Sequence, residues 1–164
     1  GPGINIKRHI LCGRNFEYLS EDPVLAGELA AAYINGLQEG GVSASLKHFA
    51  VNSQEKYREA LSAEIDERTL REIYLRGFEI AVRQAQPGAV MTSYNKVNGT
   101  YVNNSRELVT DVLRSEWGFD GVVMTDWFAT GRGLGSHALC IAAGNDLIMP
   151  GTPAAAPRCR DGGI

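Results

Sequence analysis

The sequence has no long apolar run, no excess of basic residues and no closely spaced cysteine pair. Its apolar runs are far shorter than the roughly 20 residues of a membrane-spanning helix, which argues against a membrane protein. The 16 Lys and Arg against 19 Asp and Glu give a net charge of −3, without the basic surface typical of nucleic-acid or anionic-membrane partners. Cys12, Cys140 and Cys159 lie far apart, so we expect free thiols. These features indicate no particular compartment.

The sequence also lacks the short motifs of nucleotide and metal sites. No G-x-G-x-x-G or P-loop pattern follows a predicted strand, which disfavours a nucleotide-binding sheet. His48 is far in sequence from His9 and His137, and no H-x-x-x-H spacing occurs, which disfavours a histidine metal site. We therefore expect neither a cofactor nor a metal.

What the sequence does contain is an alternation of predicted strands and helices. The predicted strands are the apolar segments 1–6, 42–49, 89–94, 121–126 and 146–150. The predicted helices are the segments 20–41, 66–88, 105–118 and 135–145, and Asp22 is the predicted N-cap of the first. The dipeptide Asn98-Gly99 predicts a tight turn. This alternation indicates a parallel sheet covered by helices, either an open doubly wound sheet or a (β/α)8 barrel.

Chain length favours part of a barrel. A complete (β/α)8 barrel needs roughly 250 residues, whereas this chain has 164. We predict an α/β fold that is an incomplete (β/α)8 TIM-type barrel, its later part only, with about five parallel strands alternating with helices. Residues 1–151 are predicted to form this partial barrel domain. Residues 152–164, rich in Ala, Pro and Gly, are predicted to be a linker or a truncated end.

Polar residues stand at the predicted carboxyl ends of three strands, at Lys47-His48, Tyr94-Asn95 and Asp126. Active sites of barrels collect at such strand ends. Asp126 ends the apolar segment "GVVMTD", where a carboxylate costs free energy unless it is paired or used. It is therefore either a helix cap or salt-bridge partner, or a nucleophile that attacks the anomeric carbon of a sugar.

The strand-end residues Lys47 and His48 admit three interpretations. One side chain could be exposed and the other buried, as alternation along a strand dictates. Lys47 could form a Schiff base, as in barrel aldolases. Both could donate hydrogen bonds to sugar hydroxyls. Tyr94 is either a core residue with its hydroxyl at the rim or the donor that aims a nearby carboxylate.

Arg14 and Trp127 each have a structural and a functional interpretation. Arg14 could pair with Glu17 or Glu21 at the surface, or its forked donors could reach a hydroxyl-rich ligand. Trp127 could be a core residue, or its ring could form a floor against which the C–H face of a sugar stacks. The functional interpretations point to the same chemistry, because a barrel would bring these strand ends together.

Long stretches of the chain resemble the N-terminal barrel domain of glycoside hydrolase family 3, the β-glucosidase-like enzymes. The stretches are "GRNFEYLSEDP", "SLKHFAVNSQE", "PGAVMTSYNKVNG", "LRSEWGFDGVVMTDW" and "AAGNDLIMPG", and together they cover roughly residues 1 to 151. The resemblance implies a retaining exo-acting glycosidase that forms a covalent glycosyl-aspartate intermediate, with two carboxyl groups about 5 Å apart. The implied substrate is a β-glucoside or oligosaccharide with a terminal non-reducing β-D-glucosyl residue.

The same resemblance implies a role for each candidate residue. Asp126 would be the catalytic nucleophile. The residues implied to contact or line the sugar site are Arg14, Lys47, His48, Met91, Tyr94 and Trp127. Among these, Arg14, Lys47 and His48 would bind sugar hydroxyls, whereas Met91 would line the pocket.

The proton donor is not among these residues. In β-glucosidase-like members it comes from a C-terminal α/β sandwich domain, which this sequence does not contain. A bacterial N-acetylglucosaminidase branch uses a histidine after a "KHFPGHG"-type motif, but this chain reads "KHFAVNSQE". The resemblance therefore implies the glucosidase branch, and we expect the 164-residue chain alone to be inactive. Three alternatives remain open: a β-xylosidase or other family member, a non-catalytic sugar-binding barrel, and an aldolase that uses Lys47.

Overall fold

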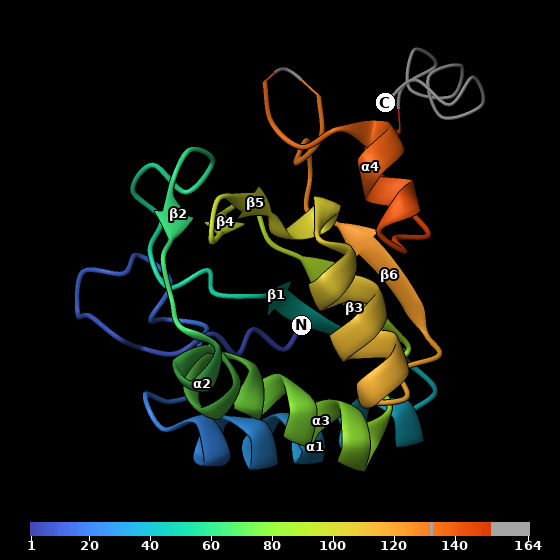
Figure 1. Cartoon of the computed structure of the whole chain (residues 1–164). Coiled ribbons are helices and arrows are strands. Elements are labelled where there is room, and N and C mark those ends of the chain that lie inside the picture. Colours follow the sequence, from blue (N-terminus) through green and yellow to red (C-terminus); the bar gives the residue numbers. More distant parts are fainter. Residues whose placement is uncertain (132, 152–164) are drawn as a thin grey trace.

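The computed structural model describes residues 1–131 and 133–151 (Figure 1). The helices are α1 (Pro23–Glu39), α2 (Glu67–Thr69), η1 (Leu70–Leu75), α3 (Arg76–Ala85), η2 (Val102–Asn104), η3 (Glu107–Glu116) and α4 (His137–Ala142). The strands are β1 (Ser45–Phe49), β2 (Ser62–Ala63), β3 (Ala89–Thr92), β4 (Lys96–Val97), β5 (Thr100–Tyr101) and β6 (Val122–Thr125). The tail predicted at 152–164, with Cys159, lies outside these residues. Across the part of the chain described, no helix is both long and apolar enough to cross a bilayer.

The central sheet is parallel and follows chain order, β1-β3-β6. Isolated parallel bridges extend it on both sides, from Gly3 to Lys47 and from Met124 to Leu147. The five predicted strand positions therefore lie side by side with helices between them. This arrangement confirms the predicted partial α/β barrel, and within the described residues the sheet does not close.

The two outer strand positions are shorter than predicted. At the first, Pro2 has no N–H to donate, and the register of β1 with β3 is irregular between Lys47 and Phe49. At the last, the Asp146 side chain takes the place of a main-chain acceptor, because its Oδ2 accepts the Val123 N–H at 2.7 Å. Main-chain hydrogen bonds still cross both edges, for example from the Lys47 N–H to the Pro2 carbonyl and from the Thr125 N–H to the Leu147 carbonyl, both at 2.9 Å.

One face of the sheet is covered by helices and the other carries the longer polar and sulfur side chains. Leu46, Val90 and Val123 lie in register, are fully buried and belong to the hydrophobic core. Figure 1 shows α1 and α3 side by side below the sheet, on the side of this core. The next register row, Lys47, Met91 and Met124, is only partly buried, since alternate side chains point to opposite faces.

Helix and turn signals in the sequence correspond to local contacts. Asp22 caps α1, and its Oδ1 accepts the Leu25 N–H at 2.7 Å. The helix predicted at 66–88 is the run α2, η1 and α3, whose middle part has π-type hydrogen bonds. Asn98 and Gly99 have left-handed φ values of 48° and 84° and join β4 to β5, as the dipeptide predicts. The short strand β2, parallel to β4, was not predicted.

We expect Gly27→Ala to destabilise the protein, because glycine allows α1 and α3 to approach closely. A Cβ atom at Gly27 would lie 2.8 Å from Ile80 Cβ and 3.0 Å from the Gly77 carbonyl oxygen. Relieving this overlap should cost about 1–3 kcal/mol, more than the roughly 1 kcal/mol of helix propensity that alanine adds. Gly36→Ala, on the open side of the same helix, is the matched control and should stabilise slightly. Equal rises in both thermal midpoints would contradict this account.

Candidate active site

Asp126 lies directly after β6, at the carboxyl end of the sheet. Its N–H donates to the Thr92 carbonyl at 3.1 Å, which continues the pairing of β6 with β3. Its Oδ1 accepts the Trp127 N–H at 2.7 Å, and its Oδ2 lies 3.6 Å from His48 Nε2. The residue is 9% exposed. Oδ1 therefore binds the next main-chain N–H, although no described helix begins there, while Oδ2 faces the other polar strand ends.

The ionisation of Asp126 is set by opposing effects. Burial is the largest and raises the pKa of this carboxyl above its ordinary value. The Trp127 N–H and the positive charges of Arg58, Arg14 and Lys47 act in the opposite direction. The carboxylate is thus poorly hydrated but faces three cations, an environment suited to a nucleophile for an electron-poor carbon.

His48 is neutral at ordinary pH. Burial, followed by the charges of Lys47, Arg14 and Arg58, lowers its pKa to about 2. Its contact with Asp126 is therefore one between a neutral imidazole and a carboxylate, not an ion pair. On the other side of the ring, Nδ1 lies 3.2 Å from the Tyr18 hydroxyl.

Asn5 fixes the main chain at His48. Its side-chain N–H donates to the His48 carbonyl and its Oδ1 accepts the His48 N–H, both at 2.9 Å. These two bonds hold His48 where β1 leaves regular register with β3. Sequence reasoning missed Asn5, although an asparagine between two isoleucines in "GPGINI" is a detectable signal.

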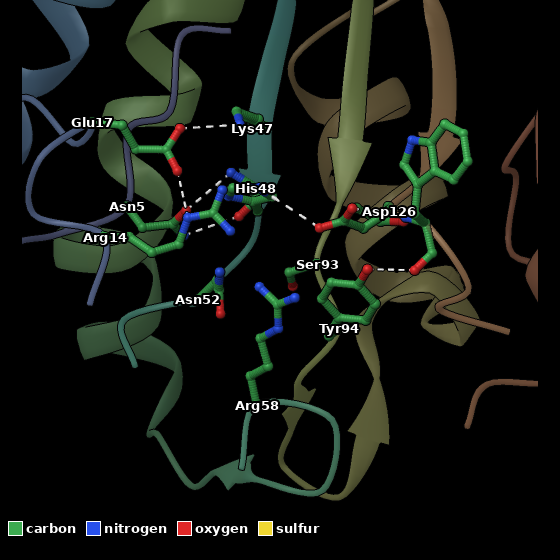
Figure 2. A network of polar contacts seen from close by, with 12 residues as sticks. Asn5, Arg14, Glu17, Lys47, His48, Asn52, Arg58, Ser93, Tyr94 and Asp126 are labelled. Atoms are coloured by element: carbon green, nitrogen blue, oxygen red, sulfur yellow. Dashed lines mark hydrogen bonds and ion pairs between the residues drawn. The ribbon is translucent and has the colours of Figure 1, made fainter. Parts of the chain in front are cut away.

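Glu17 joins two of the predicted sugar-binding residues. Its carboxylate accepts from Arg14 Nε and lies 3.0 Å from Lys47 Nζ (Figure 2). Burial would raise the pKa of Glu17, but hydrogen bonds from Lys47 and Arg14 hold it below its ordinary value. Arg14 therefore has the predicted partner Glu17 and is also fixed beside Lys47. Both cationic heads retain donors beyond those that Glu17 uses.

Tyr94 and Trp127 form the other side of the site. The Tyr94 hydroxyl donates to the main-chain carbonyl of Trp127, and it also lies beside the Asp126 carboxylate. Burial and the nearby Asp126 charge raise the Tyr94 pKa to about 12, so the hydroxyl stays protonated. Trp127 is 55% exposed and does not belong to the hydrophobic core of the described residues.

The structure brings the predicted residues to one end of the sheet. Figure 2 shows His48, Tyr94 and Asp126 converging from the ends of separate strands. Met91 lies in β3 opposite Lys47, on the face away from the helices. In the described part of the chain, no group of three or more His, Cys, Asp or Glu side chains could hold a metal.

The comparisons with known proteins agree with this geometry. The profile of the glycosyl hydrolase family 3 N-terminal domain matches residues 1–155. The β-glucosidase of Rhizobium radiobacter is 57% identical over 152 residues, which are 92% of this chain and 18% of that protein. Thermostable β-glucosidase B of Acetivibrio thermocellus is 54% identical over 150 residues, 92% of this chain and 19% of that protein.

Solved structures show the same relationship. β-Glucosidase 3B of Thermotoga neapolitana in complex with glucose is 52% identical, with a TM-score of 0.89 over 94% of this chain and 21% of that chain. The family 3 β-glucosidase of Bifidobacterium adolescentis is 48% identical, with a TM-score of 0.93 over 100% of this chain and 24% of that chain. The chain spans about a fifth of the length of these relatives. It belongs to glycosyl hydrolase family 3 and corresponds to part of the N-terminal, barrel-type domain of that family.

Proposed function

We propose that this chain is the nucleophile-bearing part of a retaining β-glycosidase that releases terminal non-reducing β-D-glucosyl residues. The observation that carries the proposal is the Asp126 carboxylate. It is buried at a strand end, with Oδ1 held by the Trp127 N–H and Oδ2 facing a neutral His48. The names of the relatives, all β-glucosidases, support glucose as the sugar.

In the first proposed step, Asp126 Oδ2 attacks the anomeric carbon. A C–O ester bond forms while the bond to the leaving oxygen breaks, and an acid elsewhere in the protein protonates that oxygen. Arg14 and Lys47 hold sugar hydroxyls through the donors that Glu17 leaves free. Because Glu17 fixes the charged groups of Arg14 and Lys47 before substrate arrives, substrate binding costs little conformational entropy of these side chains.

In the second proposed step, water attacks the same carbon and releases Asp126 as a carboxylate. The group that acted as acid now accepts a proton from that water. We propose that this group lies on a C-terminal α/β sandwich domain of a longer polypeptide, called the full-length protein below. Residues 1–151 would be part of its barrel domain, and residues 152–164 a linker or truncated end. We accordingly expect the 164-residue chain alone to be inactive.

The contacts of Lys47 disfavour the aldolase alternative. A Schiff base requires a free amine, whereas the Lys47 ammonium is 3.0 Å from Glu17 Oε2 in an ion pair. A β-xylosidase would use the same nucleophile and differ only where the sixth carbon of glucose is recognised. A non-catalytic sugar-binding barrel would bind without turnover.

The test is the configuration of the first product. An aryl β-glucoside and an aryl β-xyloside are each incubated with the full-length protein, and the anomeric proton of the released sugar is followed by NMR. We expect β-glucose to appear first and to mutarotate afterwards. An α-product would exclude the covalent intermediate, and turnover of the xyloside alone would exclude glucose. Binding of both sugars without turnover would favour the non-catalytic barrel.

A further inference from the structure

Arg58 reaches the site from a loop that no strand-end argument includes. It lies between β1 and β2, and its guanidinium carbon is 4.4 Å from the centre of the Tyr94 ring. Figure 2 shows this guanidinium pointing toward the site, from a different side than Lys47. The side chain is about three-quarters buried. A guanidinium at this distance is attracted by the ring electrons of tyrosine.

Glu55 anchors Arg58 in that position. Arg58 Nη1 is 2.6 Å from Glu55 Oε2, and the main-chain N–H of Arg58 donates to the main-chain carbonyl of Glu55. Glu55 is itself fixed, because its N–H donates to the Cys12 carbonyl and its Oε1 accepts from Asn52. The guanidinium is therefore held in place by two neighbouring segments of the chain.

A continuous series of contacts links Arg58 to Asp126. The Arg58 guanidinium stacks on the Tyr94 ring, the Tyr94 hydroxyl donates to the Trp127 carbonyl, and the Trp127 N–H donates to Asp126 Oδ1. A substitution of Arg58 would therefore alter the charge around the Asp126 carboxylate and also the position of the Trp127 main chain, whose N–H orients that carboxylate.

We propose that Arg58 is a positioning residue for the nucleophile. The charge of Arg58 holds Asp126 ionised, and the contact of Arg58 with Tyr94 holds the carboxylate aimed. The inference rests on the proposed function and extends it to a residue that does not itself touch the reacting atoms. Glu55 is the matching anchor, since it fixes the guanidinium without reaching Asp126.

The charges that face Asp126 distinguish the effect of Arg58 from the effects of its neighbours. Arg14 comes from the segment before α1, Lys47 from β1 and Arg58 from the following loop, and of these three cations Arg58 opposes the effect of burial most. His48 faces the carboxylate as a neutral ring, because its pKa is about 2.

Tyr94, whose pKa is about 12, does not titrate in the acidic range either. Asp126 is thus the facing group whose loss of a proton should govern the acidic limb of activity. Removing the Arg58 charge should raise the pKa of Asp126, so the acidic limb should move to higher pH.

The experiment measures kcat/KM for an aryl β-glucoside against pH in the full-length protein. Arg58→Met should lower kcat/KM roughly tenfold on the acidic limb, with a smaller loss above it. Arg58→Lys keeps the positive charge and should restore most of the kcat/KM lost on the acidic limb. Arg68→Met is the control, because Arg68 is exposed on α2 and pairs only with Glu72 among the described residues.

Each other outcome overturns the inference. The inference fails if the acidic limb of Arg58→Met does not move. It also fails if Arg68→Met shows the same shift. A raised KM with an unchanged pH profile would make Arg58 a substrate contact instead. If Arg58→Met does not fold, Arg58→Gln keeps a polar group on Glu55 and must show the same shift. If the protein without substitutions turns over the glucoside and the Arg58 variants show none of these effects, this inference alone is refuted. If the protein without substitutions shows no turnover, the proposed function is refuted as well.

Discussion

Asp126→Ala in the full-length protein should lower kcat for an aryl β-glucoside by roughly 10⁴- to 10⁶-fold, the loss typical of removing a nucleophile. Among the described residues, Asp126 is the carboxylate that directly follows the carboxyl end of β6. Its Oδ2 is the oxygen that faces His48. KM should change far less, because Arg14, Glu17 and Lys47 remain in place. Steady-state kinetics with a good phenolate leaving group measure both constants.

Azide provides a second measurement on the same variant. It should enter the space left by the carboxylate, form a bond to the anomeric carbon as the phenolate leaves, and give an α-glucosyl azide. Asp111→Ala is the control, since Asp111 is exposed on η3, 3.9 Å from Arg106. An Asp126→Ala protein that keeps more than about a tenth of the activity would remove Asp126 from the mechanism.

Phe49→Ala should cost about 3–5 kcal/mol of stability, the usual loss for a buried phenylalanine. Phe49 is fully buried, and its ring packs edge-on against the rings of Phe78 and Trp117, with distances between ring centres of 5.4 Å and 5.9 Å. It follows His48 directly, so a collapse of this packing would also displace the site. Calorimetry of the full-length protein should show a markedly lower unfolding temperature for the barrel domain.

The matched control for Phe49 is another phenylalanine with the opposite environment. Phe16 is 85% exposed, so Phe16→Ala should change stability by less than about 0.5 kcal/mol. Similar losses for both variants would mean that the core around Phe49 is not what holds β1 in place.

Residues whose position follows from strand order could be predicted from the sequence. Parallel strands align their carboxyl ends, so His48, Tyr94 and Asp126 had to meet once their strands were recognised. Local signals were equally reliable, since the Asp22 cap and the Asn98-Gly99 turn depend only on neighbouring atoms.

Residues whose position depends on loops could not be predicted in this way. Arg58 reaches Tyr94 only because Glu55 and its neighbours fold the loop back toward the sheet, and no residue periodicity encodes that path. Asn5 acts on the main chain of His48, a contact across 43 positions of sequence. The Trp127 carbonyl as an acceptor for the Tyr94 hydroxyl could not be predicted either, because the choice between carboxylate and carbonyl depends on small displacements.

The central claim is that Asp126 forms a covalent bond to the sugar. The direct test is to incubate the full-length protein with a 2-deoxy-2-fluoro-β-glucoside that bears a good leaving group, digest it and map the modified peptide by mass spectrometry. We predict one fluoroglucosyl adduct, on Asp126 in the peptide containing "VVMTDW". An adduct on another carboxylate, or rapid turnover of aryl β-glucosides with no adduct, would contradict this account.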